Sequence, residues 1–539
     1  MDSKPDLDRF DSRRSTAYAR NGMVATSQPL AAEAGVAALR KGGNAFDAAV
    51  TTAAALNVVE PMSTGIGGDV FALYRTADGD VGAFRSCGGA PADATRDAVR
   101  EQMDGDASAS MPSDGPLSVT VPGTVRGWER LLDDHGRRSL AAALDPAIEY
   151  ATEGFPVSEV IADMWTVAET LFDEDDAREE YLIDGRSPEA GEVMRLPDLG
   201  STFQTLAEEG SGAFYQGDLA ERIGSAVRER GGLLSADDLD GFEPEYVDPV
   251  STTYRGAEVY ELPPNNQGLV ALEALNVAEA IDAGSYAYDS AERVHYFAES
   301  LKRAFHDGHH YITDPEFESV PALGSKSYAA DRAGTIGERA GDVSVGGPGP
   351  PPEDGDTVLL TVADEAGNVV SLINSIFGHF GSGVVVPGTG ITLQNRGSSF
   401  SLDPDHPNRL EPGKRPFHTL IPGLVRFDRD REREDWAAFG VMGGSMQPQG
   451  HLQVLANILD YDMPLQAAMD APRWRYLEDG SLAVEDRFPE GVLPKLARRG
   501  HDVTVCPPTE FGGGQITRLT EGVLAGATEP RKDGTATGF

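Results

Sequence analysis

A loop rich in proline and glycine, followed at once by two apolar strands, constrains the fold more than any other part of the sequence. The loop, Gly346 to Asp356, is not expected to form helix or strand, because proline lacks a backbone donor and glycine is costly to order. Val358 to Ala363 is apolar and partly β-branched, and a turn at 364–368 leads into Val369 to Ile373. The sequence therefore predicts an irregular loop joined to a buried strand pair.

Thr357 lies at the junction of this loop and the first strand. Cleavage of the Asp356–Thr357 bond would give Thr357 a free α-amine, which would serve as the base that activates its own hydroxyl. An ordinary strand threonine is the alternative, and the short motif alone does not distinguish the two.

Periodicity elsewhere predicts a mixture of helices and antiparallel hairpins. The expected helices are Ser27 to Leu39 with Ser27 as its cap, Ala45 to Val58, Leu140 to Thr152, Leu219 to Arg230, Ser290 to Asp307 and Gln449 to Leu459. The further expected strands are a hairpin of Phe71 to Tyr74 with Val81 to Arg85, then 384–386, 391–393 and Ala437 to Val441. This mixture lacks strict βαβ alternation and predicts an α+β fold built in layers.

The charge of the chain restricts its partners and its environment. Its 539 residues include 87 acidic and 45 basic side chains, a net charge of −42, and only seven of the basic residues are lysine. Nucleic-acid binding is disfavoured, because phosphate contacts need a basic face. A site for a cationic partner is one explanation of the excess acid. We favour a halophilic protein, whose carboxylates stay hydrated where salt screens their repulsion.

Cysteine content and hydropathy indicate where the protein works. Two cysteines, Cys87 and Cys506, are too few for a disulfide framework or a cysteine-rich zinc site. The sequence does not decide whether these two form a single disulfide. The N-terminal residues include no apolar export signal, and no apolar run reaches about 18 residues. We expect a cytoplasmic protein without membrane spans.

Several motifs, in order along the chain, carry a resemblance to one family. They include Gly42 to Tyr74, Phe84 to Asp97, Gly355 to Gly383, Lys414 to Pro422 and Met442 to Val454. These segments resemble the γ-glutamyltransferase family of N-terminal nucleophile hydrolases. The resemblance implies an αββα four-layer sandwich. It also implies autocleavage into a large subunit, 1–356, and a small subunit, 357–539, which interleave in one globular fold.

The resemblance assigns the catalytic roles. Thr357 would attack the carbonyl of Asp356 in an N-to-O acyl shift, and later the substrate amide. Ser375 would hydrogen-bond the nucleophile, and Gly443 and Gly444 would form the oxyanion hole. The alternatives are a turn-forming serine and a tight glycine turn.

The substrate-binding positions match the family less well. Arg85 is the nearest match to the arginine that clamps the substrate's α-carboxylate, with a surface ion pair as the alternative. Phe377, Arg396 and Ser399 stand where the family has asparagine, glutamine and aspartate. Ser399 cannot supply the charge that holds an α-ammonium group, whereas Arg396 would accept a carboxylate.

His418 and Thr419 correspond to family serines that contact the carboxylate. His379, His418 and His451 lack metal-ligand spacing, so we expect no metal and no cofactor.

Three activities follow as hypotheses. The first is a threonine-nucleophile enzyme that cleaves γ-glutamyl amides such as glutathione and passes the acyl group to water or an amine. The second is an acylase or small-amide hydrolase of the same fold, similar to cephalosporin acylases or oxamate amidohydrolases. The third is an unprocessed, inactive homologue that acts as a binding protein.

The acidic surface predicts that the protein is unstable at low salt. At low salt the repulsion between carboxylates is screened less and becomes stronger. The thermal unfolding temperature should therefore fall steeply on dialysis from high to low salt. An unfolding temperature that does not depend on salt would contradict the halophilic interpretation.

Overall fold

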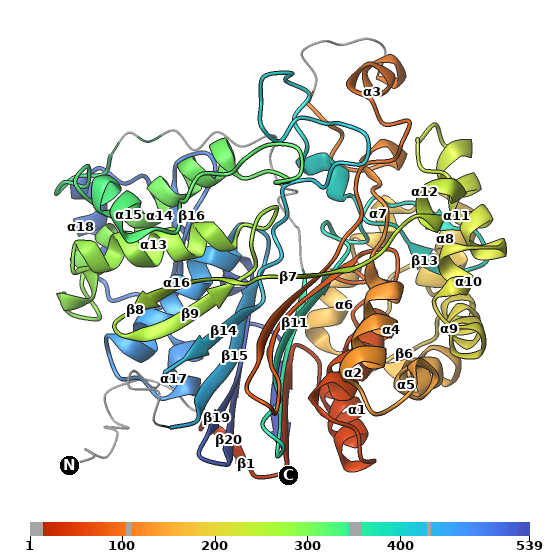
Figure 1. Ribbon diagram of the computed structural model, residues 1–539, viewed down its shortest axis with the longest axis horizontal. Helices are drawn as coiled ribbons and strands as arrows, with labels where there is room; N and C mark the ends of the chain where they lie inside the picture. The colour runs from red at the N-terminus through yellow and green to blue at the C-terminus, as the bar shows by residue number, and fades with distance from the viewer. Residues whose placement is uncertain (1–13, 104–109, 342, 344–356, 428–432) are drawn as a thin grey trace.

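Two seven-stranded sheets, stacked face to face, form the centre of the computed structural model (Figure 1). The model describes residues 14–103, 110–341, 343, 357–427 and 433–539. The first sheet runs β1 (Ala17–Ala19), β20 (Val523–Thr528), β19 (Gly513–Thr520), β15 (Asp435–Met442), β14 (Gly423–Arg426), β9 (Ala257–Glu261) and β8 (Val250–Tyr254). The second runs β21 (Thr535–Gly538), β2 (Gly22–Thr26), β10 (Val358–Asp364), β11 (Val369–Ser375), β3 (Asp69–Arg75), β4 (Val81–Ser86) and β7 (Glu245–Val247).

Helices cover the outer face of each sheet (Figure 1). The layer over the second sheet contains α1 (Pro29–Arg40), α2 (Ala45–Val59), α4 (Thr124–His135), α5 (Leu140–Glu153), α9 (Pro197–Glu209) and α11 (Asp218–Glu229). The layer over the first contains α13 (Gly268–Ala280), α14 (Ala291–Tyr311), α16 (Met446–Leu459), α17 (Leu465–Asp470) and α18 (Val492–Arg499). Because α2 packs on β10 and α16 packs on β15, the αββα sandwich expected from the sequence is confirmed.

Shorter elements complete the layers. The remaining helices are α3 (Arg96–Gln102), α6 (Glu159–Trp165), α7 (Ala168–Leu171), α8 (Asp175–Tyr181), α10 (Gly212–Tyr215), α12 (Ala236–Asp240) and α15 (Lys326–Ala333). Three small sheets pair β5 (Phe155–Pro156) with β6 (Val193–Met194), β12 (Val385–Val386) with β13 (Ile391–Thr392), and β17 (Leu482–Glu485) with β16 (Trp474–Tyr476) and β18 (Val503–Cys506). None of the described helices is both long and apolar enough to cross a membrane.

The two hairpins predicted from the sequence are confirmed, and the first helix differs at its start. β10 pairs with β11, and β3 pairs with β4, both antiparallel. α1 begins at Pro29, so its N-cap is Gln28 rather than the expected Ser27, and Gln28 makes no side-chain cap bond; the hydroxyl of Ser27 donates to Glu60, at 2.6 Å. Cys87 lies buried beyond β4 and Cys506 lies on β18, both as free thiols, so no bridge joins them.

Alternate residues of the central strands fill the space between the sheets. Phe71 on β3, Leu359 on β10 and Ile373 on β11 belong to this inter-sheet core, together with Leu424 of the facing sheet. Side chains two residues apart on a strand share a face, so the odd-numbered residues of these three strands point toward the first sheet.

A buried cluster of ions fixes the C-terminal end of the fold. Glu529 forms ion pairs with Arg473, at 2.7 Å, and with Arg531, and it accepts the backbone N–H of Gly514 on β19, at 2.7 Å. Burial alone would raise the pKa of Glu529, but the two arginines outweigh it and hold the pKa below its usual value. The carboxylate therefore stabilises the fold above its ordinary pKa, and this contribution is lost as the pH falls through the lowered value.

We expect Glu529→Gln to lower the free energy of unfolding by about 3–5 kcal/mol, because buried Arg473 loses its ion-pair partner and Arg531 keeps only its pair with Glu485. Exposed Glu490→Gln is the matched control and should stay within about 0.5 kcal/mol of the wild type. Denaturant titration at neutral pH measures both. Equal stabilities of the two variants would contradict the assigned role of the cluster.

Candidate active site

A row of polar side chains closes one end of the inter-sheet core. β10 pairs Val358 with Asn374, so Thr357 lies opposite Ser375, which itself pairs with Asp69 on β3. All three residues are odd-numbered and therefore share the face of Leu359, toward the first sheet. Thr357 is 2% exposed, and Ser375 and Asp69 are fully buried. The register of three strands thus brings together residues that lie far apart in the sequence.

The hydroxyls of Thr357 and Ser375 are hydrogen-bonded, as the sequence predicted. Thr357 Oγ1 donates to Ser375 Oγ at 3.2 Å, and the backbone N–H of Phe377 donates to the same serine oxygen at 2.9 Å. The second bond fixes the serine, and the serine in turn fixes the threonine oxygen. Asp356, the predicted partner in autocleavage, lies outside the described residues.

A glycine turn joins β15 to α16. Gly443 and Gly444 have φ values of 112° and 53°, and a side chain on Gly443 would press on Gly512 at 3.2 Å. Successive glycines at such a turn are suited to an anion-binding nest of backbone amides. Gly440, earlier on β15, packs so closely on Leu359 that a Cβ would lie 2.9 Å from it. The turn therefore lies near the start of β10, and its role as an oxyanion hole stays a prediction.

Arg396 links the nucleophile pair to the glycine turn. Its guanidinium lies 3.9 Å from the ring centre of Phe377, and Nη1 donates to Thr419 Oγ1 at 2.9 Å. Gln267 Nε2 then bridges the carbonyls of Thr419, at 2.7 Å, and Gly444, at 3.1 Å. A continuous chain of contacts therefore runs from Ser375 through Phe377 and Arg396 to the turn.

The analysis of the sequence missed Asp69, which organises the buried charges. Asp69 Oδ1 accepts from Gln394 Nε2 at 3.0 Å and from the N–H of Gly123 at 3.2 Å, and Oδ2 lies 3.0 Å from His418 Nε2. The N–H of Leu420 donates to His418 Nδ1, so the hydrogen-bond pattern assigns the imidazole proton to Nε2. The available signal was a carboxylate opening the apolar strand 69–74.

These buried groups shift one another's pKa values. Burial raises the pKa of Asp69 to about 8, and the nearby Arg396 opposes the rise. Burial lowers the pKa of Arg396 to about 9, and Asp69 opposes that fall. Burial, followed by the charges of Arg396 and Arg85, holds the pKa of His418 well below its usual value, so this imidazole is neutral.

Arg85 and Ser399 lie close to this network but are held by other partners. Arg85 donates to the carbonyl of Pro264 at 2.9 Å and forms an ion pair with Glu245 at 2.8 Å. In the structure Arg85 therefore forms an ion pair, which was the alternative considered from the sequence. Its role as a clamp for a substrate carboxylate stays a prediction. Ser399 ends the 3-10 turn η3 (Arg396–Ser399), and its carbonyl accepts from Asn408 at 2.6 Å.

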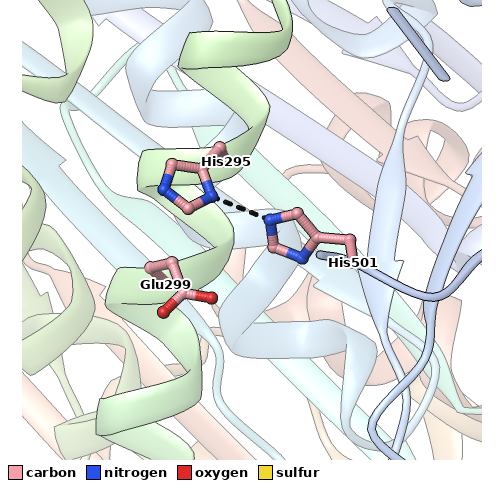
Figure 2. A group of neighbouring side chains, drawn as sticks. All are labelled: His295, Glu299 and His501. Carbon is pink, nitrogen blue, oxygen red and sulfur yellow. Dashed lines mark hydrogen bonds between the residues drawn. The ribbon is translucent and has the colours of Figure 1, made fainter. Parts of the chain in front are cut away.

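Within the described part of the chain, one group of side chains has donor atoms close enough together to hold a metal: His295, Glu299 and His501 (Figure 2). His295 Nδ1 lies 2.8 Å from His501 Nε2. Glu299 already forms ion pairs with Lys302, at 2.9 Å, and Arg303, at 2.6 Å. Two cations thus outweigh the one carboxylate, which disfavours a divalent ion here. The group belongs to α14 and the loop after α18, and the absence of a metal centre stays a prediction.

Comparison with known proteins identifies the class and the family. The model of the gamma-glutamyltranspeptidase family matches residues 31–539. The chain is 39% identical to the glutathione hydrolase-like YwrD proenzyme of Bacillus subtilis, over 96% of this chain and 98% of that one. It is 36% identical to the oxamate amidohydrolase proenzyme of Klebsiella pneumoniae, with the same coverage.

A solved structure resembles the whole molecule. The crystal structure of cephalosporin acylase from Bacillus halodurans superposes with a TM-score of 0.89 at 43% identity, covering 99% of both chains. The sandwich and these similarities define a hydrolase of the N-terminal nucleophile type. The chain belongs to the gamma-glutamyltranspeptidase family.

Replacing Ser375 tests whether this serine positions the nucleophile. Ser375→Ala should lower kcat at least about 10-fold, because it removes the hydrogen bond between the Thr357 and Ser375 hydroxyls, and Ser375→Thr should retain most activity. Ser371→Ala, on the same strand and face, removes a buried hydroxyl that bonds only a carbonyl of β15, at 3.0 Å, and should keep the rate. Equal rates for the two alanine variants would show that Ser375 does not act on Thr357.

Proposed function

We propose that the chain is a proenzyme that cleaves itself between Asp356 and Thr357 and then hydrolyses amides with Thr357 as nucleophile. The observation that carries the proposal is the buried hydrogen bond between the hydroxyls of Thr357 and Ser375 at the head of β10. A threonine that begins a chain has its own α-amine as base, and here its oxygen is already oriented toward the interior of the site.

Both halves of the chemistry use the same oxygen. In maturation, Thr357 Oγ1 attacks the carbonyl of Asp356, the peptide becomes an ester, and water releases two chains. In turnover, the oxygen attacks the substrate carbonyl, the amine leaves with a proton, and the acyl group remains as an ester until water or an amine removes it. The amides of Gly443 and Gly444 would stabilise the tetrahedral oxyanion, each by about 3–4 kcal/mol.

The two subunits would remain together after cleavage. β10 and β11, which follow the cleavage point, pair with β2 and β3, which precede it. Breaking the chain at residue 356 removes none of these ladder hydrogen bonds, so one sheet holds both subunits.

Two substrate classes are candidates for the source of the acyl group. Family membership supports γ-glutamyl amides such as glutathione, with hydrolysis or transfer of the acyl group. Ser399 favours the second candidate, an acylase or small-amide hydrolase, because it offers no charge to a substrate α-ammonium. The names of two relatives, an oxamate amidohydrolase and a cephalosporin acylase, agree with this second candidate. An inactive binding protein is less well supported, because the contacts from Thr357 to Gly444 are intact.

Intact-mass measurement under denaturing conditions tests the proposal. Wild-type protein should give two species, 1–356 and 357–539, and Thr357→Ala should give one uncut chain without amidase activity. Thr357→Ser should still cleave, because it keeps a hydroxyl. Thr361→Ala, which removes another buried threonine hydroxyl of β10, is the matched control and should cleave normally. A cut and active Thr357→Ala variant would overturn the assignment.

A further inference from the structure

We propose that Arg396 binds a free carboxylate on the acyl group, so that the preferred substrates are monoamides of dicarboxylic acids without an α-ammonium group. This inference rests on the proposed function and specifies its substrate class.

One edge of the Arg396 guanidinium makes no hydrogen bond to the described residues. Nη1 is committed to Thr419 Oγ1, and one face is covered by the ring of Phe377. Among the described residues, Nε and Nη2 have no hydrogen-bond partner, although the side chain is fully buried. These two N–H groups point the same way along one edge of the guanidinium, which is the fork that binds both oxygens of a carboxylate.

In the part of the chain that the structure describes, no carboxylate pairs with this edge. Asp69 is the nearby carboxylate, but its oxygens are engaged by Gln394, Gly123 and His418, and it forms no ion pair with Arg396 in the structure. A buried cation without a direct partner is unfavourable, so a ligand carboxylate gains more here than at a solvated arginine. Although burial lowers the pKa of Arg396 to about 9, the group remains charged near neutral pH.

Arg396 is also close to the reacting atoms. Phe377, which lies against the guanidinium, donates its N–H to Ser375, and Ser375 bonds Thr357. In this proposal, a carboxylate bound by Nε and Nη2 belongs to the acyl group that Thr357 receives. Ser399, at the far end of the same 3-10 turn, offers an α-ammonium only a hydroxyl.

The bond changes are those of ordinary amide hydrolysis. Thr357 Oγ1 forms the ester with the acyl carbon as the C–N bond breaks and the amine takes the hydroxyl proton. Water then releases the dicarboxylic acid. No oxidant, reductant or further reactant is needed.

The first experiment compares charged and uncharged acyl anilides on the processed wild-type enzyme. Oxalyl, malonyl, succinyl and glutaryl anilides are paired with uncharged acyl anilides of equal length, and γ-glutamyl anilide is added. At least one charged anilide should exceed its uncharged partner in kcat/KM by about 10-fold or more, through a lower KM, and glutaryl should match or exceed γ-glutamyl. Equal values within every pair, or a 10-fold or greater preference (about 1.4 kcal/mol) for γ-glutamyl, would overturn the inference.

The second experiment replaces Arg396, the residue proposed to bind the carboxylate. Arg396→Gln should reduce the charged-to-uncharged ratio of kcat/KM toward one, mainly through KM, and Arg396→Lys should restore part of the ratio, because it keeps the charge but not the fork. Ser399→Asp should shift the preference from glutaryl toward γ-glutamyl anilide, because the new carboxylate would hold the ammonium. A ratio that survives Arg396→Gln in folded, processed enzyme would assign the carboxylate to another residue.

The two proposals fail in different ways. If a processed enzyme hydrolyses charged and uncharged anilides equally well, the proposed function stands and the inference about Arg396 is wrong. If the chain stays uncut and hydrolyses none of the anilides, both the proposed function and the inference are wrong. If Arg396→Gln fails to process, the comparison on wild-type enzyme still decides.

Discussion

The register of β3, β10 and β11 is the constraint on which the site depends. Side chains alternate between the two faces of a strand, so a slip of one residue would turn Thr357, Ser375 and Asp69 toward the helices. The same slip would remove Leu359 and Phe71 from the inter-sheet core. The apolar residues therefore fix the positions of the polar ones, and the burial that stabilises the sandwich also aligns the nucleophile with its serine.

The buried ionisable side chains of the site influence one another's pKa values. Asp69 and Arg396 are both buried, and each opposes the shift that burial imposes on the pKa of the other. His418 remains neutral, with its proton on Nε2 toward Asp69, while its Nδ1 accepts the N–H of Leu420. Replacing Asp69 or Arg396 would expose the other to the full effect of burial on its pKa, so the two act as a unit.

Local sequence patterns predicted much of this architecture. The contacts that were missed join residues far apart in the sequence. The hairpin after the loop, the contact of Ser375 with Thr357 and the glycine turn each follow from a short segment or a hairpin. Asp69 was missed, because its partners come from residues 123, 394 and 418, and one sequence carries no record of such pairings. The partner of Arg85, Glu245, was missed for the same reason.

The three unusual residues of the site form one coherent set. Phe377 gives the delocalised guanidinium of Arg396 an apolar face, where a smaller polar side chain would leave a gap. Arg396 and Ser399 begin and end the same turn, so an aspartate at 399 would add a negative charge on the same turn as the buried guanidinium. Serine at this position adds no such charge. In the proposed substrate site, the absence of a charge for an ammonium and the presence of one for a carboxylate would thus be parts of a single change in what the site can recognise.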